Sequence, residues 1–160
     1  MTPGFLRRKV LDPLTAQLTQ GVSPDRLALA LALGGVVGVV PVLGTTTLLC
    51  AAVAAALRLN QPAIQVANYL AYPLQLALFI PFFQAGAWLF GQPPVPFTLG
   101  QLQAELSADV LGTIARYLVH DLRAVAAWAL AALPAAGLLF LLLRALLRRL
   151  PLPVTSTRGR

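Results

Sequence analysis

The stretch LALALALGGVVGVVPVLGTTTLLCAAVAAALR, residues 27–58, decides the fold, because it is uncharged until Arg58 and is broken near its middle by glycine and proline. Pro41 lacks an amide hydrogen, and its ring opposes a continuing helix. One helix over residues 27–57 would be roughly 46 Å long, well beyond the roughly 30 Å hydrocarbon core of a bilayer. Two half-helices of about 14 residues would each reach roughly 21 Å. A full span and a re-entrant hairpin are the two alternatives, and the break at residues 40–44 favours the hairpin.

The composition of the whole chain points to a bilayer. Charged residues make up 11% of the 160 residues and hydrophobic residues 58%, and the mean hydropathy is +0.78. Ordinary soluble domains carry about 25% charged residues. Acidic and basic residues are absent from residues 27–57, 59–104 and 124–143. Each gap is long enough for the roughly 20 apolar residues that a spanning helix needs, so we expect an all-α, polytopic membrane protein.

The net charge of +7 does not indicate nucleic-acid binding. The arginines flank apolar stretches, as in membrane topology signals, and do not form an interleaved basic surface. Cys50 is the only cysteine, so neither an intramolecular disulfide nor a cysteine-based metal site is expected. One histidine and a few scattered acids form no recognisable catalytic group. We therefore expect no enzyme activity, no catalytic residue, no cofactor and no metal.

Charge also predicts the organisation and topology of the chain. Residues 144–160 carry five arginines and no acid, whereas residues 91–123 carry two arginines and three acids. By the positive-inside tendency, both termini face the cytoplasm and the middle segment lies outside. The expected segments are an amphipathic cytoplasmic segment 1–22, a membrane domain 23–145 and a basic cytoplasmic tail 146–160. Within the membrane domain we expect a broken hairpin 24–58, a span 62–90, an amphipathic helix 99–122 and a span 124–143.

Two groups of residues are candidates for binding a substrate. A proline and glycine break inside a membrane leaves free backbone groups, which transporters use to hold ions, although small residues also serve close helix packing. Polar side chains at membrane depth either line a substrate path or bond backbone freed near Pro73. The candidates are Gly38, Pro41, Gly44, Thr45, Thr46, Asn68, Tyr72 and Gln75.

Two turns in this region also carry a family resemblance. Residues 38–44 have the pattern G-x-x-P-x-x-G, and residues 57–63 have the pattern L-R-x-N-x-P-A. The chain therefore resembles the DUF2062 family of bacterial membrane proteins over about residues 5–145. Many members have Asn-Pro-Leu-Thr in the later segment, where this chain has Tyr-Pro-Leu-Gln at residues 72–75. The resemblance implies a multi-pass protein of the bacterial cytoplasmic (inner) membrane and implies no particular activity.

Two functions from different classes follow. The first is transport of a small molecule or lipid, with an anionic group held at the hairpin break. The second is a non-catalytic membrane scaffold or accessory protein that docks a partner through helix 5–20 or 99–122. The expected partners are the lipid bilayer, an anionic lipid or small anionic substrate, and a second copy of the chain in a homo-oligomer.

Overall fold

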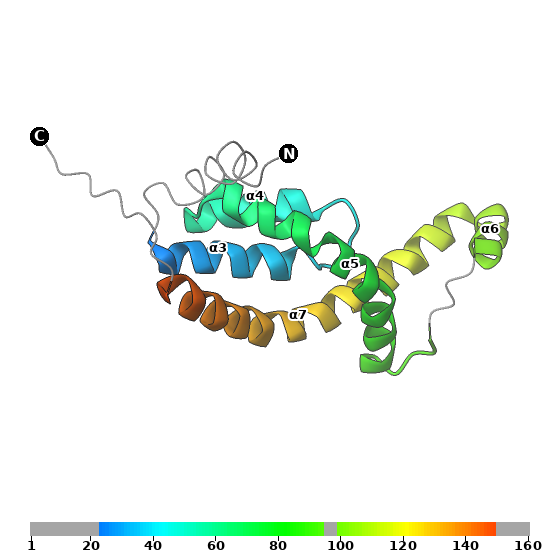
Figure 1. Cartoon of the computed structure of the whole chain (residues 1–160). Helices are drawn as coiled ribbons and strands as arrows, with labels where there is room; N and C mark the ends of the chain where they lie inside the picture. Colours follow the sequence, from blue (N-terminus) through cyan, green and yellow to red (C-terminus); the bar gives the residue numbers. More distant parts are fainter. Residues whose placement is uncertain (1–22, 95–98, 150–160) are drawn as a thin grey trace, which may run out of the picture.

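The computed structural model describes residues 23–94 and 99–149. The segment predicted over residues 1–22 and most of the basic tail, residues 150–160, lie outside this part. Its elements are all helices (Figure 1): α3 Pro24–Val37, α4 Thr46–Leu57, α5 Gln61–Leu89, α6 Leu99–Ala108 and α7 Val110–Arg149.

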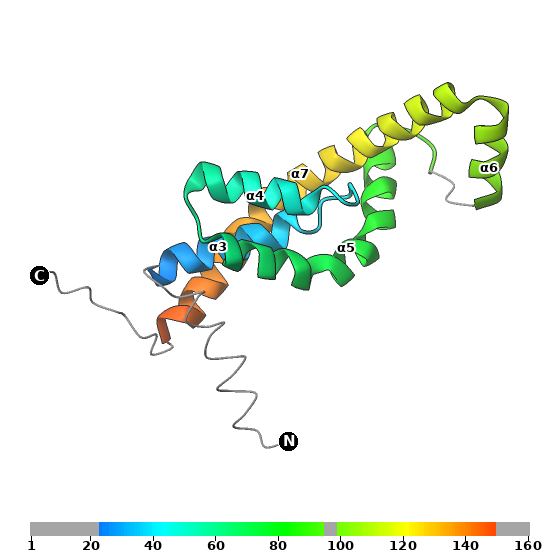
Figure 2. The same cartoon turned by 90° about the horizontal axis from the view of Figure 1, so that it is seen from above.

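Helix α3 lies at the centre, with α4, α5 and α7 packed around it (Figures 1 and 2). It begins with the cap that the sequence indicates: the Ser23 hydroxyl accepts a hydrogen bond from the Arg26 amide at 3.3 Å, and Pro24 follows at the first helical position. Helix α3 ends at Val37, and the fully buried Pro41 follows in the turn. The predicted break in residues 27–57 is therefore present, and a single continuous helix is excluded.

Helices α3 and α4 form a hairpin whose open ends lie together. The Arg26 guanidinium donates to the Arg58 carbonyl at 3.2 Å, although 32 residues separate them. Arg58 ends α4 in the left-handed conformation, with φ of 51°. Asn60 then caps α5 by accepting a hydrogen bond from the Ala63 amide at 2.9 Å. Local signals thus mark the start of α3, the end of α4 and the start of α5.

Helix α5 packs against α3 through small residues. A Cβ atom added at Gly34 would lie 2.3 Å from the Ile64 carbonyl oxygen and 2.8 Å from the Ala67 Cβ. One added at Gly38 would lie 3.0 Å from the Ala71 Cβ. Backbones approach this closely where small residues recur every four positions on both helices.

Further along, α5 bends away from the bundle (Figures 1 and 2). Pro73 and Pro81 lie inside this helix and each removes one backbone hydrogen bond. The bent end crosses α7, where a Cβ added at Gly86 would meet the Arg123 carbonyl carbon at 2.6 Å. The crossing holds the two long helices together beyond the hairpin.

The boundary between the last two helices differs from the prediction of a helix 99–122 and a span 124–143. The helix break lies at Asp109, and α7 continues through residue 123 as one helix of 40 residues. The Asp109 carboxylate accepts a hydrogen bond from the Gly112 amide at 3.0 Å. No proline, glycine or capping residue occurs at 122–124, so the helix has no local reason to stop there.

The outward surfaces of α5 and α7 are apolar. Both helices are long and apolar enough to cross a membrane. The most apolar stretch of α5 is 22% buried within the protein, and that of α7 is 0% buried. A core helix of a soluble protein would be mostly buried, and neither of these stretches is.

Candidate functional site at the hairpin break

Two side chains from other helices donate hydrogen bonds to backbone carbonyls at the end of α3 and in the turn that follows it. The Gln75 amide, 1% exposed, donates to the Val40 carbonyl at 2.8 Å. The Trp128 indole donates to the Val36 carbonyl at 3.1 Å. Of these two donors, the sequence singles out Gln75 but not Trp128. An indole N–H in an otherwise uncharged stretch was the available signal, because buried tryptophan N–H groups usually find an acceptor.

The tip of the hairpin is formed by residues 41–45. Gly44 has φ of +82° and no heavy atom within 4 Å of the position of an added Cβ, so the turn is open. The Thr45 hydroxyl donates to the Val42 carbonyl at 2.9 Å. This hydroxyl therefore stabilises the turn and makes no capping bond to α4.

A polar seam joins α4 to α5. The Gln65 side-chain amide donates to the Thr47 backbone carbonyl at 3.0 Å, and the Asn68 side-chain amide donates to the Gln65 side-chain oxygen Oε1 at 3.3 Å. Asn68 and the neighbouring Thr46 are buried. The sequence singles out Thr46 and Asn68, whereas Thr47 and Gln65 emerge only from the packing of the two helices.

Three of the predicted residues have separate surroundings. Tyr72 is 52% exposed and takes no part in the seam. Gly38 serves close packing against Ala71 and the Asn68 backbone. Gln75 bonds backbone freed near Pro41, at the hairpin break.

The C-terminal end of α3 and the N-terminal end of α4 therefore differ in their hydrogen bonding. Protein donors close the carbonyl end of α3. At the start of α4, in contrast, no side chain of the described residues accepts from the amides of residues 46–48. A helix N-terminus carries partial positive charge and free amides, which suit an anion. The start of α4 can therefore offer three backbone amide donors and a partial positive charge to an anion.

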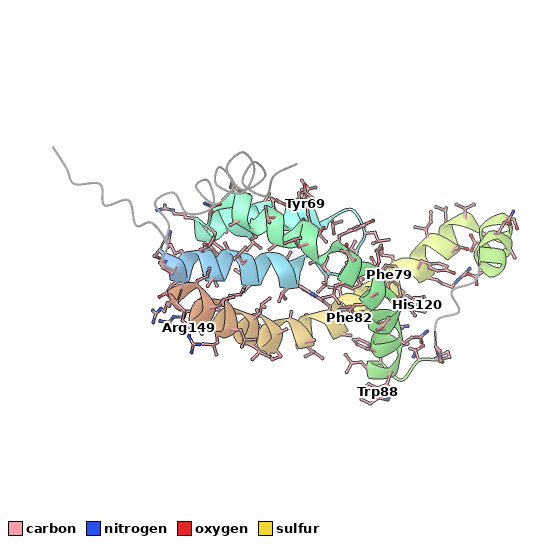
Figure 3. All side chains as sticks on the ribbon, viewed as in Figure 1. Tyr69, Phe79, Phe82, Trp88, His120 and Arg149 are labelled. Atoms are coloured by element: carbon pink, nitrogen blue, oxygen red, sulfur yellow. The ribbon has the colours of Figure 1, made fainter. Side chains whose placement is uncertain are left out.

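A second feature lies where α5 crosses α7, near the Phe79 and His120 labels in Figure 3. It is an open groove of about 370 Å³. Its lining is apolar and aromatic apart from Asp121, and comprises Phe79, Phe83, Ile114, Tyr117, Leu118 and Asp121. Across the described residues, histidine, cysteine and acidic side chains form no group of three that is able to hold a metal ion.

The fold thus defines an all-helical protein with a broken central hairpin and two helices long and apolar enough to cross a membrane. The chain belongs to the DUF2062 family, described as an uncharacterized protein conserved in bacteria, whose family model matches residues 6–151. This match confirms the family resemblance seen in the sequence. Comparison with curated proteins gives no match, and comparison with solved structures gives none.

Proposed function

We propose that this chain is a multi-pass, non-enzymatic protein of the bacterial cytoplasmic membrane that binds an anionic group at the tip of a re-entrant hairpin. The group belongs to a small solute or a lipid that the protein transports. One observation carries the proposal: α4 begins without a side-chain cap, while the opposing carbonyl end of α3 is closed by protein donors.

The apolar outer surface and the distribution of charge support the membrane location. Five arginines of the described residues gather at the open end of the hairpin and the C-terminal end of α7, where Figure 3 labels Arg149. The opposite end, residues 105–123, carries three acids and two arginines. The positive-inside tendency assigns the arginine-rich end, and with it both termini, to the cytoplasm.

The length of the hairpin supports its re-entrant placement. Helix α3 has 14 residues and is therefore about 21 Å long. The hydrocarbon core is about 30 Å thick. A hairpin that starts at the cytoplasmic face with Arg26 and Arg58 together ends inside the membrane, so its tip lies within the bilayer.

At that depth the free amides of α4 need an acceptor. Each unsatisfied backbone group in hydrocarbon costs several kcal/mol, and irregular backbone is tolerated there only beside protein or a water-filled cavity. The tip is open around Gly44, so a solute or headgroup can reach the amides. An anion satisfies the donors and complements the helix dipole together.

Substitutions at Thr47, in the first turn of α4, test the site by charge alone. Thr47→Asp adds a carboxylate beside the amides, whereas Thr47→Asn is nearly the same size and neutral. Two like charges about 4 Å apart, here the new carboxylate and the bound anion, repel by about 4 kcal/mol at an effective dielectric constant near 20. Screening reduces this repulsion, and the expected result is still a roughly tenfold or greater loss of anion affinity. We expect this loss for Thr47→Asp and a change of less than about threefold for Thr47→Asn.

The assay uses purified protein in vesicles and three probes: radiolabelled inorganic phosphate, radiolabelled succinate, and a fluorescent phosphatidylglycerol whose transfer between leaflets is followed by quenching. Rates are normalised to folded protein. Equal transport rates in the Thr47→Asp and Thr47→Asn variants would exclude the hairpin tip as the anion site. Rates no higher than in protein-free vesicles for all three probes argue against transport of these ligand classes.

The projecting arm favours a second candidate function, a membrane scaffold. Helix α6 and the first half of α7 extend away from the bundle (Figure 1). Leu111 is 81% exposed, and Ile114, in the groove, is 56% exposed. A stable partner that is lost in Ile114→Asn, together with the absence of flux, would favour the scaffold over transport.

A further inference from the structure

At the start of α3, the Asp25 carboxylate pairs with two arginines, Arg144 and Arg148, from the C-terminal end of α7. The Arg144 Nε and Nη2 atoms lie 3.1 and 3.5 Å from the two Asp25 carboxylate oxygens. The Arg148 Nε and Nη2 atoms lie 3.1 and 2.8 Å from the same oxygens. Both guanidinium groups therefore approach Asp25 side-on, and one negative charge faces two positive charges.

More positive charge surrounds this pair. Arg26 follows Asp25 and contacts the Arg58 carbonyl, and Arg149 follows Arg148. Neither Arg58 nor Arg149 forms an ion pair within residues 23–94 and 99–149. Five arginines and one carboxylate leave four excess positive charges. We name this group, Asp25 with Arg26, Arg58, Arg144, Arg148 and Arg149, the arginine end.

The excess positive charge favours binding of an anion. The hydrogen bond from Arg148 is the largest cause that holds the pKa of Asp25 below its ordinary value; burial opposes it, and the hydrogen bond from Arg144 and the charges of both arginines lower the pKa further. Asp25 is therefore ionised at neutral pH and already included in the balance. Side-on pairing through Nε and Nη2 leaves the Nη1 edge of each guanidinium able to donate to a second acceptor. Planar guanidinium groups are well suited to phosphate oxygens.

Apolar side chains of α7 lie next to the arginine end. The Phe140 ring centre is 5.9 Å from the Arg144 guanidinium carbon. Leu142 and Leu146 are 59% and 57% exposed, and they lie within two helical turns of Arg148. A ligand with a phosphate group and apolar chains matches this order of surfaces along α7.

We propose that the arginine end binds the phosphate group of an anionic phospholipid in the adjacent leaflet. This inference rests on the membrane location given under the proposed function and does not depend on the hairpin tip, which lies at the other end of α3. Free inorganic phosphate offers the same anionic oxygens but makes no use of the apolar surface. A phospholipid engages both parts, so we assign the lipid.

The test compares arginines that leave the Asp25 pair intact with one at the opposite end of the molecule. Arg58→Gln and Arg149→Gln, singly and together, are measured against Arg116→Gln, which is similarly exposed and pairs with Glu105. Full-length protein in nanodiscs is titrated with fluorescent phosphatidylglycerol in a phosphatidylcholine background. Each arginine removed should weaken binding about fivefold, and the double variant about 25-fold. Arg116→Gln should bind like the wild type.

Two further arms identify the source of the phosphate and isolate this site. Inorganic phosphate at 10 mM should compete weakly; full displacement of the lipid by phosphate at this concentration overturns the lipid assignment. Asp25→Asn, which frees two guanidinium groups, should retain or strengthen lipid binding, and a loss would show that the cluster acts only in folding. Unchanged binding in the Arg58 and Arg149 double variant overturns the site.

Different results would overturn the lipid site at the arginine end and the anion site at the hairpin tip. Protein that remains soluble without detergent would overturn the membrane location and both proposals. Normal lipid binding together with equal rates in Thr47→Asp and Thr47→Asn would overturn the hairpin-tip site alone.

Discussion

Two adjacent glycines of α3 allow the packing of the hairpin to be tested with an internal control. A Cβ added at Gly34 would lie 2.3 Å from the Ile64 carbonyl oxygen, which belongs to the α5 backbone. A Cβ added at Gly35 would lie 3.3 Å from the Leu139 Cδ2, the far end of a flexible side chain. Gly34→Ala and Gly35→Ala therefore add the same methyl group to the same helix in two different surroundings.

The expected energies follow from these distances. Alanine is favoured over glycine in a helix by about 0.5–1 kcal/mol, and this gain is shared by both variants. At Gly34 the new methyl is about 1 Å closer to its neighbour than the 3.4 Å of an ordinary contact, so α3 and α5 must separate. Such overpacking costs about 1–3 kcal/mol. Gly34→Ala should be net destabilising by about 1–2 kcal/mol, and Gly35→Ala should be neutral or stabilising by about 0.5 kcal/mol.

The measurement is the free energy of unfolding in mild detergent, followed by far-ultraviolet circular dichroism during titration with sodium dodecyl sulfate. The helix-propensity contribution cancels in the difference between the two variants, which should be about 1–3 kcal/mol. Gly137→Ala, in α7 with no heavy atom within 4 Å of the added Cβ, gives a second control. If Gly34→Ala is as stable as Gly35→Ala, the close approach of α3 and α5 is refuted.

Three other predictions concern the break, the arginine end and the topology. Gln75→Leu leaves the buried Val40 carbonyl without its donor and should lower the free energy of unfolding by about 1–3 kcal/mol. Gln61→Leu removes an exposed hydrogen bond and should lower it by less than about 1 kcal/mol. Equal losses for the two variants in the same titration would contradict a special role of Gln75 at the break. The pKa of Asp25 is lowered from 3.8 in the folded protein, so its stabilising effect is complete above pH 3.8 and lost as the pH falls through the folded pKa. Melting temperatures should therefore drop below pH 3.8 in wild type, with a smaller drop in Asp25→Asn. In a Cys50→Ala background, a membrane-impermeant maleimide added to intact cells should label Gln92→Cys but should label neither Asp25→Cys nor Gln61→Cys. Labelling of Asp25→Cys or Gln61→Cys without the other would rule out the re-entrant hairpin.

Much of the hairpin was predictable because its signals are local. Pro41 opposes a continuing helix, and α3 ends at Val37, shortly before it. Ser23 and Asn60 cap amides that lie only three residues later. The boundary between α6 and α7 was misplaced even though its signal, the Asp109 cap, is also local. Asp109 lies inside a regular apolar repeat, and that periodicity outweighed the capping residue in the prediction.

The candidate site was predicted only in part. Polar residues inside apolar segments must find partners, and the side-chain amides of Gln75 and Asn68 both donate hydrogen bonds to other residues of the protein. Their partners depend on the axial register between helices. Tyr72 lies only three residues from Gln75 on α5, and yet it is 52% exposed whereas Gln75 is 1% exposed.

The sequence by itself determined the helical class, the apolar segments, the break at Pro41 and the separation of positive charge toward one end. These properties follow from composition and from interactions within a few residues. Only the tertiary structure decided that Trp128 closes the carbonyl end of α3 and that Asp25 is shared by Arg144 and Arg148. More than 90 residues separate the partners in each of these contacts, and their distances depend on how closely small residues let the helices approach. Helix packing, and not local sequence, therefore brings these groups together.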